Sequence, residues 1–192
     1  MKLENSFEVA APPERAWELL MDVPRVVPCM PGATLKEVVD DSHWKAEMAV
    51  RLGPIGLTFD TDVAREEVDA AARRVLLAAK AREVRNRGRA QATIESRLSP
   101  LDGGGTRIEL TTDLTLSGPA AQYGRGMIQD ISSQLVTSFA QCLEAQLAAS
   151  PEQAREAVAA QAKPLSGLSL AFAALISRLR RGIRRLKGEK NA

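Results

Sequence analysis

The alternation of apolar and polar residues at the start of the chain predicts a strand followed by a short helix. Residues 3–10 alternate with a period of two, as a half-buried strand does. Residues 13–21 begin with a proline, which the first turn of a helix tolerates, and their apolar side chains fall along one stripe. Residues 23–32 contain three prolines, so we expect at most one short helical turn there, followed by a constrained loop.

From Ala33 to Leu116 the pattern keeps a period of two, with apolar residues on one face and charged residues on the other. This pattern is typical of an antiparallel meander with one solvated face. Turn-forming residues interrupt it and delimit six strands. The interruptions are Asp40–Asp41, Gly53–Pro54, Asp69–Ala72, Asn86–Gly88 and Asp102–Gly105.

Residues 119–149 change to a period near 3.6, which predicts a closing helix of about 30 residues across the dry face of the sheet. The order strand, helix, six strands, helix indicates an α+β fold. A chain of 192 residues, 45% of them hydrophobic, can bury one core and leave a tail. We therefore predict a domain at 1–149, a linker at 150–164 and a tail at 165–192.

The predicted dry face mixes large side chains with unusually small ones, among them Ala46, Ala79 and Ala81. Small residues under a long helix either leave an apolar volume for a ligand or let the helix pack closer, and the pattern leaves both open. Gly124 and Gly126, near the start of the helix, indicate either close packing of the helix on the sheet or a gap through which a ligand enters. The candidate ligand-binding residues are Met30, Pro31, Trp44, Met48, Phe59, Ala90, Ala92, Tyr123, Met127, Ile131 and Leu135.

The tail is strongly basic, whereas the rest of the chain is mildly acidic. Residues 165–192 hold seven Lys or Arg and one acid, which leaves 19 basic and 23 acidic residues before them. Apolar residues at spacings of three and four form one stripe, which predicts an amphipathic helix lying in a membrane interface. The candidate membrane-binding residues are Leu168, Phe172, Leu175, Ile176, Leu179, Arg178, Arg181 and Arg185.

Other partners for the tail stay open: a partner protein, the chain's own sheet, or nucleic acid. A nucleic-acid arm would not need the apolar stripe, so we expect no nucleic-acid partner. The chain has no uncharged apolar run of about 18–20 residues, the length of a spanning helix, and its N-terminus lacks the pattern of a secretory signal. We expect a cytoplasmic protein, peripheral on the inner face of the cell membrane.

Few residues suggest catalysis or metal binding. The single histidine, His43, lies beside a predicted turn, and the two cysteines, Cys29 and Cys142, are far apart in the sequence. No metal-ligand spacing and no Ser/His/Asp or Cys/His set can be assigned from the sequence. We therefore predict no metal and no enzymatic activity, and both cysteines as buried, unpaired small apolar residues in a reducing cytoplasm.

Several separated motifs resemble one known family. They are the opening strand at 2–9, PPERAWELLMD at 12–22, VVPCMPGA at 26–33, GPIG at 53–56 and YGRGMIQDI at 123–131. In this order they are similar to the CoxG family, named for carbon monoxide dehydrogenase, within the START-like (SRPBCC) helix-grip superfamily. The family's loop usually reads Leu-Pro-Gly-Cys, whereas here Met30-Pro31-Gly32 is followed by Ala33.

The resemblance implies a helix-grip fold, in which a seven-stranded antiparallel sheet wraps around a long C-terminal helix. It implies an accessory protein of a molybdenum-dependent carbon monoxide dehydrogenase or related hydroxylase, associated with placing that enzyme at the membrane, and no catalytic residues. Our hypothesis is that the cavity binds a lipophilic molecule, a respiratory quinone such as menaquinone or ubiquinone. The alternatives are a pure membrane anchor without ligand, and a small-molecule cyclase or hydrolase.

Overall fold

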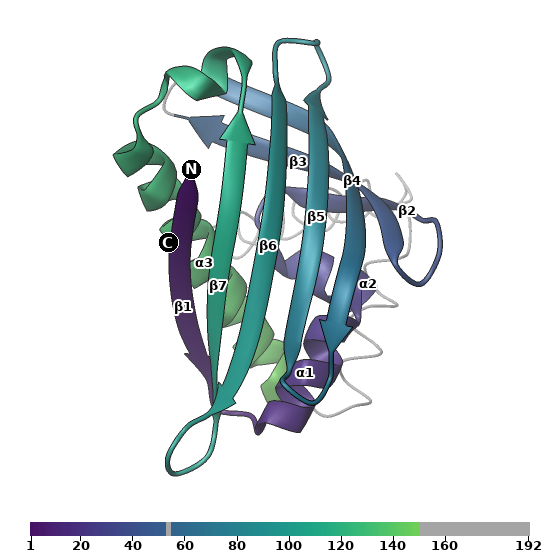
Figure 1. The fold of residues 1–192 in the computed structure, drawn as a ribbon, viewed down its shortest axis with the longest axis vertical. Helices are drawn as coiled ribbons and strands as arrows, with labels where there is room; N and C mark the ends of the chain where they lie inside the picture. Colours follow the sequence, from purple (N-terminus) through teal and green to yellow (C-terminus); the bar gives the residue numbers. More distant parts are fainter. Residues whose placement is uncertain (53–54, 150–192) are drawn as a thin grey trace, which may run out of the picture. The chain divides into compact units, whose positions relative to one another are not determined.

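The seven predicted strands pair into one antiparallel sheet, in the order β1-β7-β6-β5-β4-β3-β2. The computed structural model describes residues 1–52 and 55–149 (Figure 1). The six successive strands predicted after Ala33 are therefore confirmed. The strands are β1 (Lys2–Val9), β2 (Ala33–Val38), β3 (His43–Leu52), β4 (Ile55–Asp69), β5 (Arg74–Glu83), β6 (Arg89–Pro100) and β7 (Thr106–Leu116).

Three short helical segments connect β1 to β2: α1 (Pro13–Met21), α2 (Val23–Val26) and η1 (Val27–Cys29). Helix α1 confirms the helix predicted at residues 13–21. The expectation of at most one turn within 23–32 is wrong, because two short segments form there. Pro24 and Pro28 each stand at the start of a segment, where a missing N–H costs nothing, and the Asp22 carboxylate accepts a hydrogen bond from the Arg25 N–H at 3.3 Å.

The closing helix is shorter than predicted. The segment η2 (Gly118–Gln122) is a 3₁₀ turn, and the long helix α3 (Arg125–Ala148) has 24 residues. Tyr123 and Gly124 between them are extended. The Tyr123 hydroxyl donates to the Leu52 carbonyl at 3.0 Å, and this contact holds the chain at the end of β3 before α3 begins.

The apolar core consists of two separate clusters on the inner face of the sheet. The α1-side cluster contains Phe7, Val9, Ala16, Leu19, Cys29, Leu98, Ile108, Phe139, Leu143 and Leu147. The η2-side cluster contains Leu52, Leu57, Phe59 and Ala120. The last three turns of α3 belong to the first cluster, and Ile131 packs on the second. The helix therefore lies along the dry face, as predicted.

Cys29 and Cys142 form a disulfide, so the prediction of two unpaired thiols is wrong. The bond joins η1 to α3 across 113 residues of sequence. It forms because η1 packs against α3 and brings the two Cα atoms within 5.3 Å. The Gln146 side chain also joins α3 to the neighbouring α2, by donating to the Arg25 carbonyl at 3.0 Å.

The predicted linker and the predicted tail, residues 150–192, lie outside the described residues. Within residues 1–52 and 55–149, no helix combines the length and the apolar character that crossing a membrane requires.

Candidate ligand-binding site

The small residues of the dry face form one contiguous surface at the centre of the sheet. Strand register places Ala79 opposite Ala92 and Ala81 opposite Ala90. Thr61 of β4 joins this group, because it pairs with both Ala81 and Ala46. We call these residues the small-residue patch: Ala46, Thr61, Ala79, Ala81, Ala90 and Ala92.

The small-residue patch is only partly covered, although Ala81 packs against the η2-side cluster. Every residue of the patch is half-buried, whereas the two apolar clusters on either side consist of buried side chains. Interiors of proteins are normally packed to the density of organic crystals, so inward-facing alanines that keep solvent exposure border unfilled volume. We therefore interpret the patch as the floor of a hollow; its residues are not among those that line the pocket described next.

A pocket of about 310 Å³ opens between α3 and the end of β3. Gly32 is required at its rim, because its φ is +81° and an added Cβ would lie 2.1 Å from the Ala49 carbonyl oxygen. The volume falls within the range of small-molecule sites, roughly 300–1,000 Å³. The lining residues are Pro31, Gly32, Ala49, Val50, Arg51, Ile131, Gln134, Leu135 and Ser138.

The structure brings together some of the sequence-predicted ligand residues and separates others. Pro31, Ile131 and Leu135 line the pocket, and Ala90 and Ala92 belong to the small-residue patch. Met48, Phe59 and Tyr123 pack in or against the η2-side cluster, whereas Met30 packs against the α1-side cluster.

Two predicted ligand residues have other surroundings. Trp44 is buried, and the Arg65 guanidinium lies 5.0 Å from the centre of its ring, at a cation–π distance. Met127 is not among the residues that line the pocket, and its side chain is 45% exposed on the first turn of α3. Met127 is at the border of the apolar stripe, where the 3.6 period does not distinguish a buried position from an exposed one.

The sequence did not point to the polar residues of the pocket, Arg51, Gln134 and Ser138. Arg51 alternates with inward-facing residues, which is the pattern of an ordinary solvent-facing strand residue. Gln134 and Ser138 lie beside the apolar stripe of α3, where polar residues normally face water. Their position at the pocket follows from where α3 lies beside the end of β3, which the periodicity of a single element does not report.

A second hollow, of about 400 Å³, lies over β1, β6 and β7. Charged and hydroxyl side chains dominate its lining, so it does not match an apolar ligand. The residues are Glu4, Asn5, Ser6, Glu95, Arg97, Glu109, Leu110 and Thr111.

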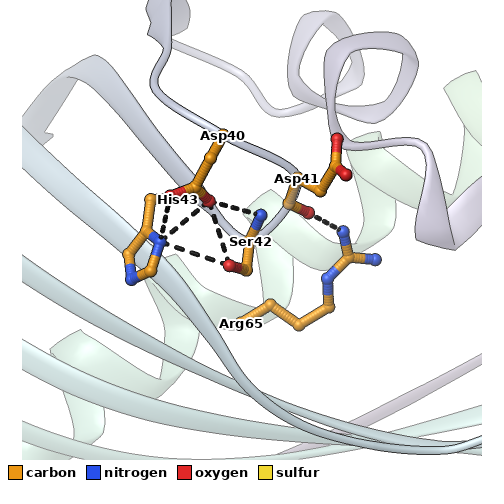
Figure 2. Close-up of polar contacts among 5 residues, drawn as sticks. All are labelled: Asp40, Asp41, Ser42, His43 and Arg65. Carbon is orange, nitrogen blue, oxygen red and sulfur yellow. Dashed lines mark hydrogen bonds and ion pairs between the residues drawn. The ribbon is translucent and has the colours of Figure 1, made fainter.

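Asp40, Ser42 and His43 lie together in the turn between β2 and β3 (Figure 2). Asp40 and Ser42 both contact the same ring nitrogen of His43, Nδ1, at 2.9 and 3.2 Å. In a catalytic triad the serine and the acid contact opposite nitrogens, so this group cannot relay a proton from Ser42 to Asp40. A hydrogen bond from the Ser42 backbone N–H and a smaller contribution from the His43 side chain lower the pKa of Asp40 to about 2.

Arg65 fixes this turn to the rest of the domain. Its guanidinium donates to the carbonyl of Asp41, as Figure 2 shows, and to that of Met21 at 3.3 Å. The Arg65 backbone N–H donates to the Ser42 carbonyl at 2.8 Å. We conclude that the Asp40–His43 cluster has a structural role in the turn. No group of three His, Cys, Asp or Glu residues suited to a metal ion occurs in the part of the chain that the structure describes.

Glu83 is a buried acid, 2% exposed, at the end of β5. Its carboxylate accepts hydrogen bonds from the Arg87 guanidinium at 2.8 Å and from the backbone N–H groups of Arg85 and Arg87. These donors, the Arg87 side chain first, lower the pKa of Glu83 to about 2 although burial opposes them. Glu83 therefore holds the β5–β6 hairpin in its conformation.

Glu83→Gln is expected to destabilise the domain at neutral pH. A lowered folded-state pKa stabilises the fold above the ordinary pKa of 4.5, and this contribution is lost as pH falls towards about 2. The difference in unfolding free energy between wild type and Glu83→Gln should therefore shrink across that range, as measured by urea unfolding at a series of pH values. Glu66→Gln, at an exposed carboxylate of β4, is the control; an equal effect of both variants would contradict the prediction.

With this geometry established, comparison with known families gives one decisive match. The family model for CoxG, a subunit of carbon monoxide dehydrogenase, matches residues 6–148. The chain belongs to the CoxG family. The match spans β1 to α3, so the small-residue patch and the pocket both lie within the CoxG domain.

Solved structures confirm the helix-grip, START-like fold. A conserved protein from Geobacillus kaustophilus superposes with a TM-score of 0.69 at 19% identity, covering 77% of this chain and 95% of the other. The ZhuI aromatase/cyclase from Streptomyces sp. R1128 gives 0.55 at 18% identity, with coverages of 77% and 93%. A START superfamily protein from Mycobacterium smegmatis gives 0.51 at 16% identity, with coverages of 76% and 96%. No curated protein matches the chain.

Proposed function

We propose that this CoxG-family protein binds a lipophilic small molecule, a respiratory quinone such as menaquinone or ubiquinone, between its sheet and α3. The observation that carries the proposal is the small-residue patch, whose half-buried alanines leave apolar volume uncovered on the inner face of the sheet. Apolar volume of this kind is characteristic of sites for apolar ligands. The protein acts as a binding accessory and not as an enzyme.

The partner that we propose is a molybdenum-dependent carbon monoxide dehydrogenase or a related hydroxylase. The family's description as part of carbon monoxide dehydrogenase supports this assignment. Such an enzyme must pass its electrons to an acceptor, and quinone is the lipid-soluble acceptor of respiratory chains. A protein that holds quinone and contacts the enzyme would connect the two.

The location that we propose is the inner face of the cytoplasmic membrane. Residues 165–192 combine an apolar stripe with seven Lys or Arg, which suits a helix lying on anionic lipid. The tail would keep the domain where a lipophilic ligand is found.

Mass spectrometry of small molecules extracted from the purified full-length protein tests the ligand. The protein is expressed in a host that makes quinone, and we expect quinone to co-purify with it. A chain that carries no lipid or quinone, and binds no added menaquinone, would contradict the ligand proposal and favour a pure membrane anchor.

Filling the hollow gives a sharper test. Ala79→Leu combined with Ala92→Leu, a cross-strand pair of the patch, should lower menaquinone binding about tenfold or more, because the added side chains occupy the volume that a ligand requires. The matched control is Ala78→Leu with Thr93→Leu, the adjacent pair facing the other side of the sheet. Binding is measured by co-elution of added menaquinone on size-exclusion chromatography.

The stability of the same variants distinguishes a hollow from a packed core. If the volume is empty, Ala79→Leu with Ala92→Leu should leave the free energy of unfolding of the ligand-free protein unchanged or raise it by about 1 kcal/mol. If α3 already fills this space, the larger side chains should lower it by about 1–3 kcal/mol. That second outcome would support the anchor without a ligand.

A further inference from the structure

Five arginines lie in or near the hairpin between β5 and β6, and Figure 1 shows this hairpin at the opposite end of the sheet from α1. We call them the arginine strip: Arg51, Arg82, Arg85, Arg87 and Arg89. All five are exposed. Register places Arg82 directly opposite Arg89. The Arg87 guanidinium donates to the Gly56 carbonyl at 3.4 Å, and Gly56 pairs with Arg51 across the β3–β4 ladder.

The arginine strip carries positive charge that the surrounding residues leave largely unneutralised. Within residues 1–52 and 55–149, Arg87 is the member that forms an ion pair, with Glu83 at 2.8 Å. Asp60 is a second acid nearby, opposite Arg82 on β4. Like charges directly opposite on neighbouring strands are destabilising, so the Arg82–Arg89 pair costs stability that a bound anion would restore.

An exposed apolar side chain lies among these charges. Val84 follows the end of β5 and is 49% exposed, and its backbone N–H donates to the Thr58 carbonyl at 2.9 Å, which fixes its place in the hairpin. At a lipid surface an apolar side chain enters the acyl boundary while arginines bind the phosphates above it. An acidic protein surface would engage the arginines but gives no such role to the exposed valine.

The arginine strip also leads to the ligand pocket. Arg51 lines the pocket together with Gly32 and Leu135. A surface that binds Arg51 together with the rest of the strip would therefore lie next to the pocket. Lipid is the one anionic surface from which an apolar ligand can enter directly.

We propose that the arginine strip and Val84 dock on an anionic membrane and turn the pocket opening towards the lipid. This inference rests on the proposed function, in which the ligand is lipophilic, and adds a contact made by the folded domain to that of the basic tail. The tail then concentrates the protein at the membrane, and the strip sets the orientation in which ligand is exchanged.

The test is co-sedimentation of the full chain with vesicles of phosphatidylcholine containing phosphatidylglycerol. Arg82→Gln with Arg85→Gln and Arg89→Gln leaves the Glu83–Arg87 pair intact. Because each arginine near an anionic surface adds up to about a fivefold factor in binding, we expect the loss of three to lower the partition coefficient about tenfold to a hundredfold. The control, Arg15→Gln with Lys36→Gln and Arg107→Gln, removes the same charge from exposed positions outside the strip and should change binding little.

A third variant separates this inference from the function on which it rests. Arg178→Gln with Arg181→Gln and Arg185→Gln removes the same charge from the tail. If the tail variant loses vesicle binding while the strip variant behaves like its control, the tail docks alone and the strip proposal is overturned. If the wild-type chain does not bind these vesicles, both membrane proposals fail.

Two further measurements address orientation and the competing partner. Val84→Trp should show stronger quenching of tryptophan fluorescence by brominated lipid than wild type, because its indole would enter the acyl boundary. Unchanged quenching would overturn the docking geometry.

The competing partner is an acidic protein surface. If the strip variant binds vesicles normally but loses wild-type retention on immobilised polyglutamate, the strip serves an acidic protein and the membrane proposal is overturned.

Discussion

Removing the Cys29–Cys142 disulfide should lower the free energy of unfolding by about 2–4 kcal/mol. The bond closes a loop of 113 residues and joins η1 to α3 within the α1-side cluster. Loss of the bond frees the unfolded chain from this long loop, so the unfolded state gains entropy. Urea unfolding of wild type, of wild type reduced with a phosphine, and of Cys29→Ala with Cys142→Ala measures the effect.

Agreement between the reduced wild type and the double variant would assign the effect to the cross-link itself, because the variant also removes two sulfur atoms from the core. Equal stability of all three proteins would contradict the prediction. Disulfides persist mainly in oxidising compartments. Rapid alkylation of intact cells would show whether the pair is oxidised at the cytoplasmic location that we propose, or whether the less stable reduced form is the working form there.

Gly32→Ala should destabilise the domain by more than about 2 kcal/mol, because it adds backbone strain to a steric clash. The φ of +81° disfavours any residue with a Cβ, and that Cβ would lie 2.1 Å from the Ala49 carbonyl oxygen. The Ala49 N–H also donates to the Gly32 carbonyl at 2.8 Å, so moving the two strands apart would break the pairing at the rim of the pocket. Urea unfolding measures the stability, and menaquinone binding measures whether the rim of the pocket keeps its conformation.

Gly56→Ala is the matched control, since a Cβ there would meet no atom of the described residues within 4 Å and the backbone is not left-handed. We expect it to change the free energy of unfolding little. If Gly32→Ala folds with wild-type stability, then the loop before β2 is free to move away from β3. The rim of the pocket would then be less constrained than its geometry indicates.

Local patterns were sufficient for most of the fold because strands and short helices depend on neighbouring residues. Period two identified six strands after Ala33, and the proline at the start of 13–21 with its apolar stripe identified α1. The errors arose where a long-range contact decides the local conformation. The contact between Tyr123 and the Leu52 carbonyl separates η2 from α3, and a period of 3.6 cannot report it.

The candidate site was predicted in part for the same reason. Pro31, Ile131 and Leu135 were identified by their apolar character on a loop and on a helix stripe, and they meet at the pocket. Arg51, Gln134 and Ser138 were missed because they are polar residues at positions that a pattern assigns to solvent. Their presence at the pocket depends on how α3 docks beside the end of β3, to which many residues contribute.

The sequence by itself determined the strand and helix order, the identity of the family and the charge contrast between body and tail, since each of these depends on residue type and spacing. Tertiary structure alone decided three things: the disulfide between residues 113 apart, the joining of scattered alanines into one patch, and the gathering of arginines from β3, β5 and β6 at one end. All three depend on strand register and helix docking. Those are set by the packing of the whole core, so no short segment of the chain encodes them.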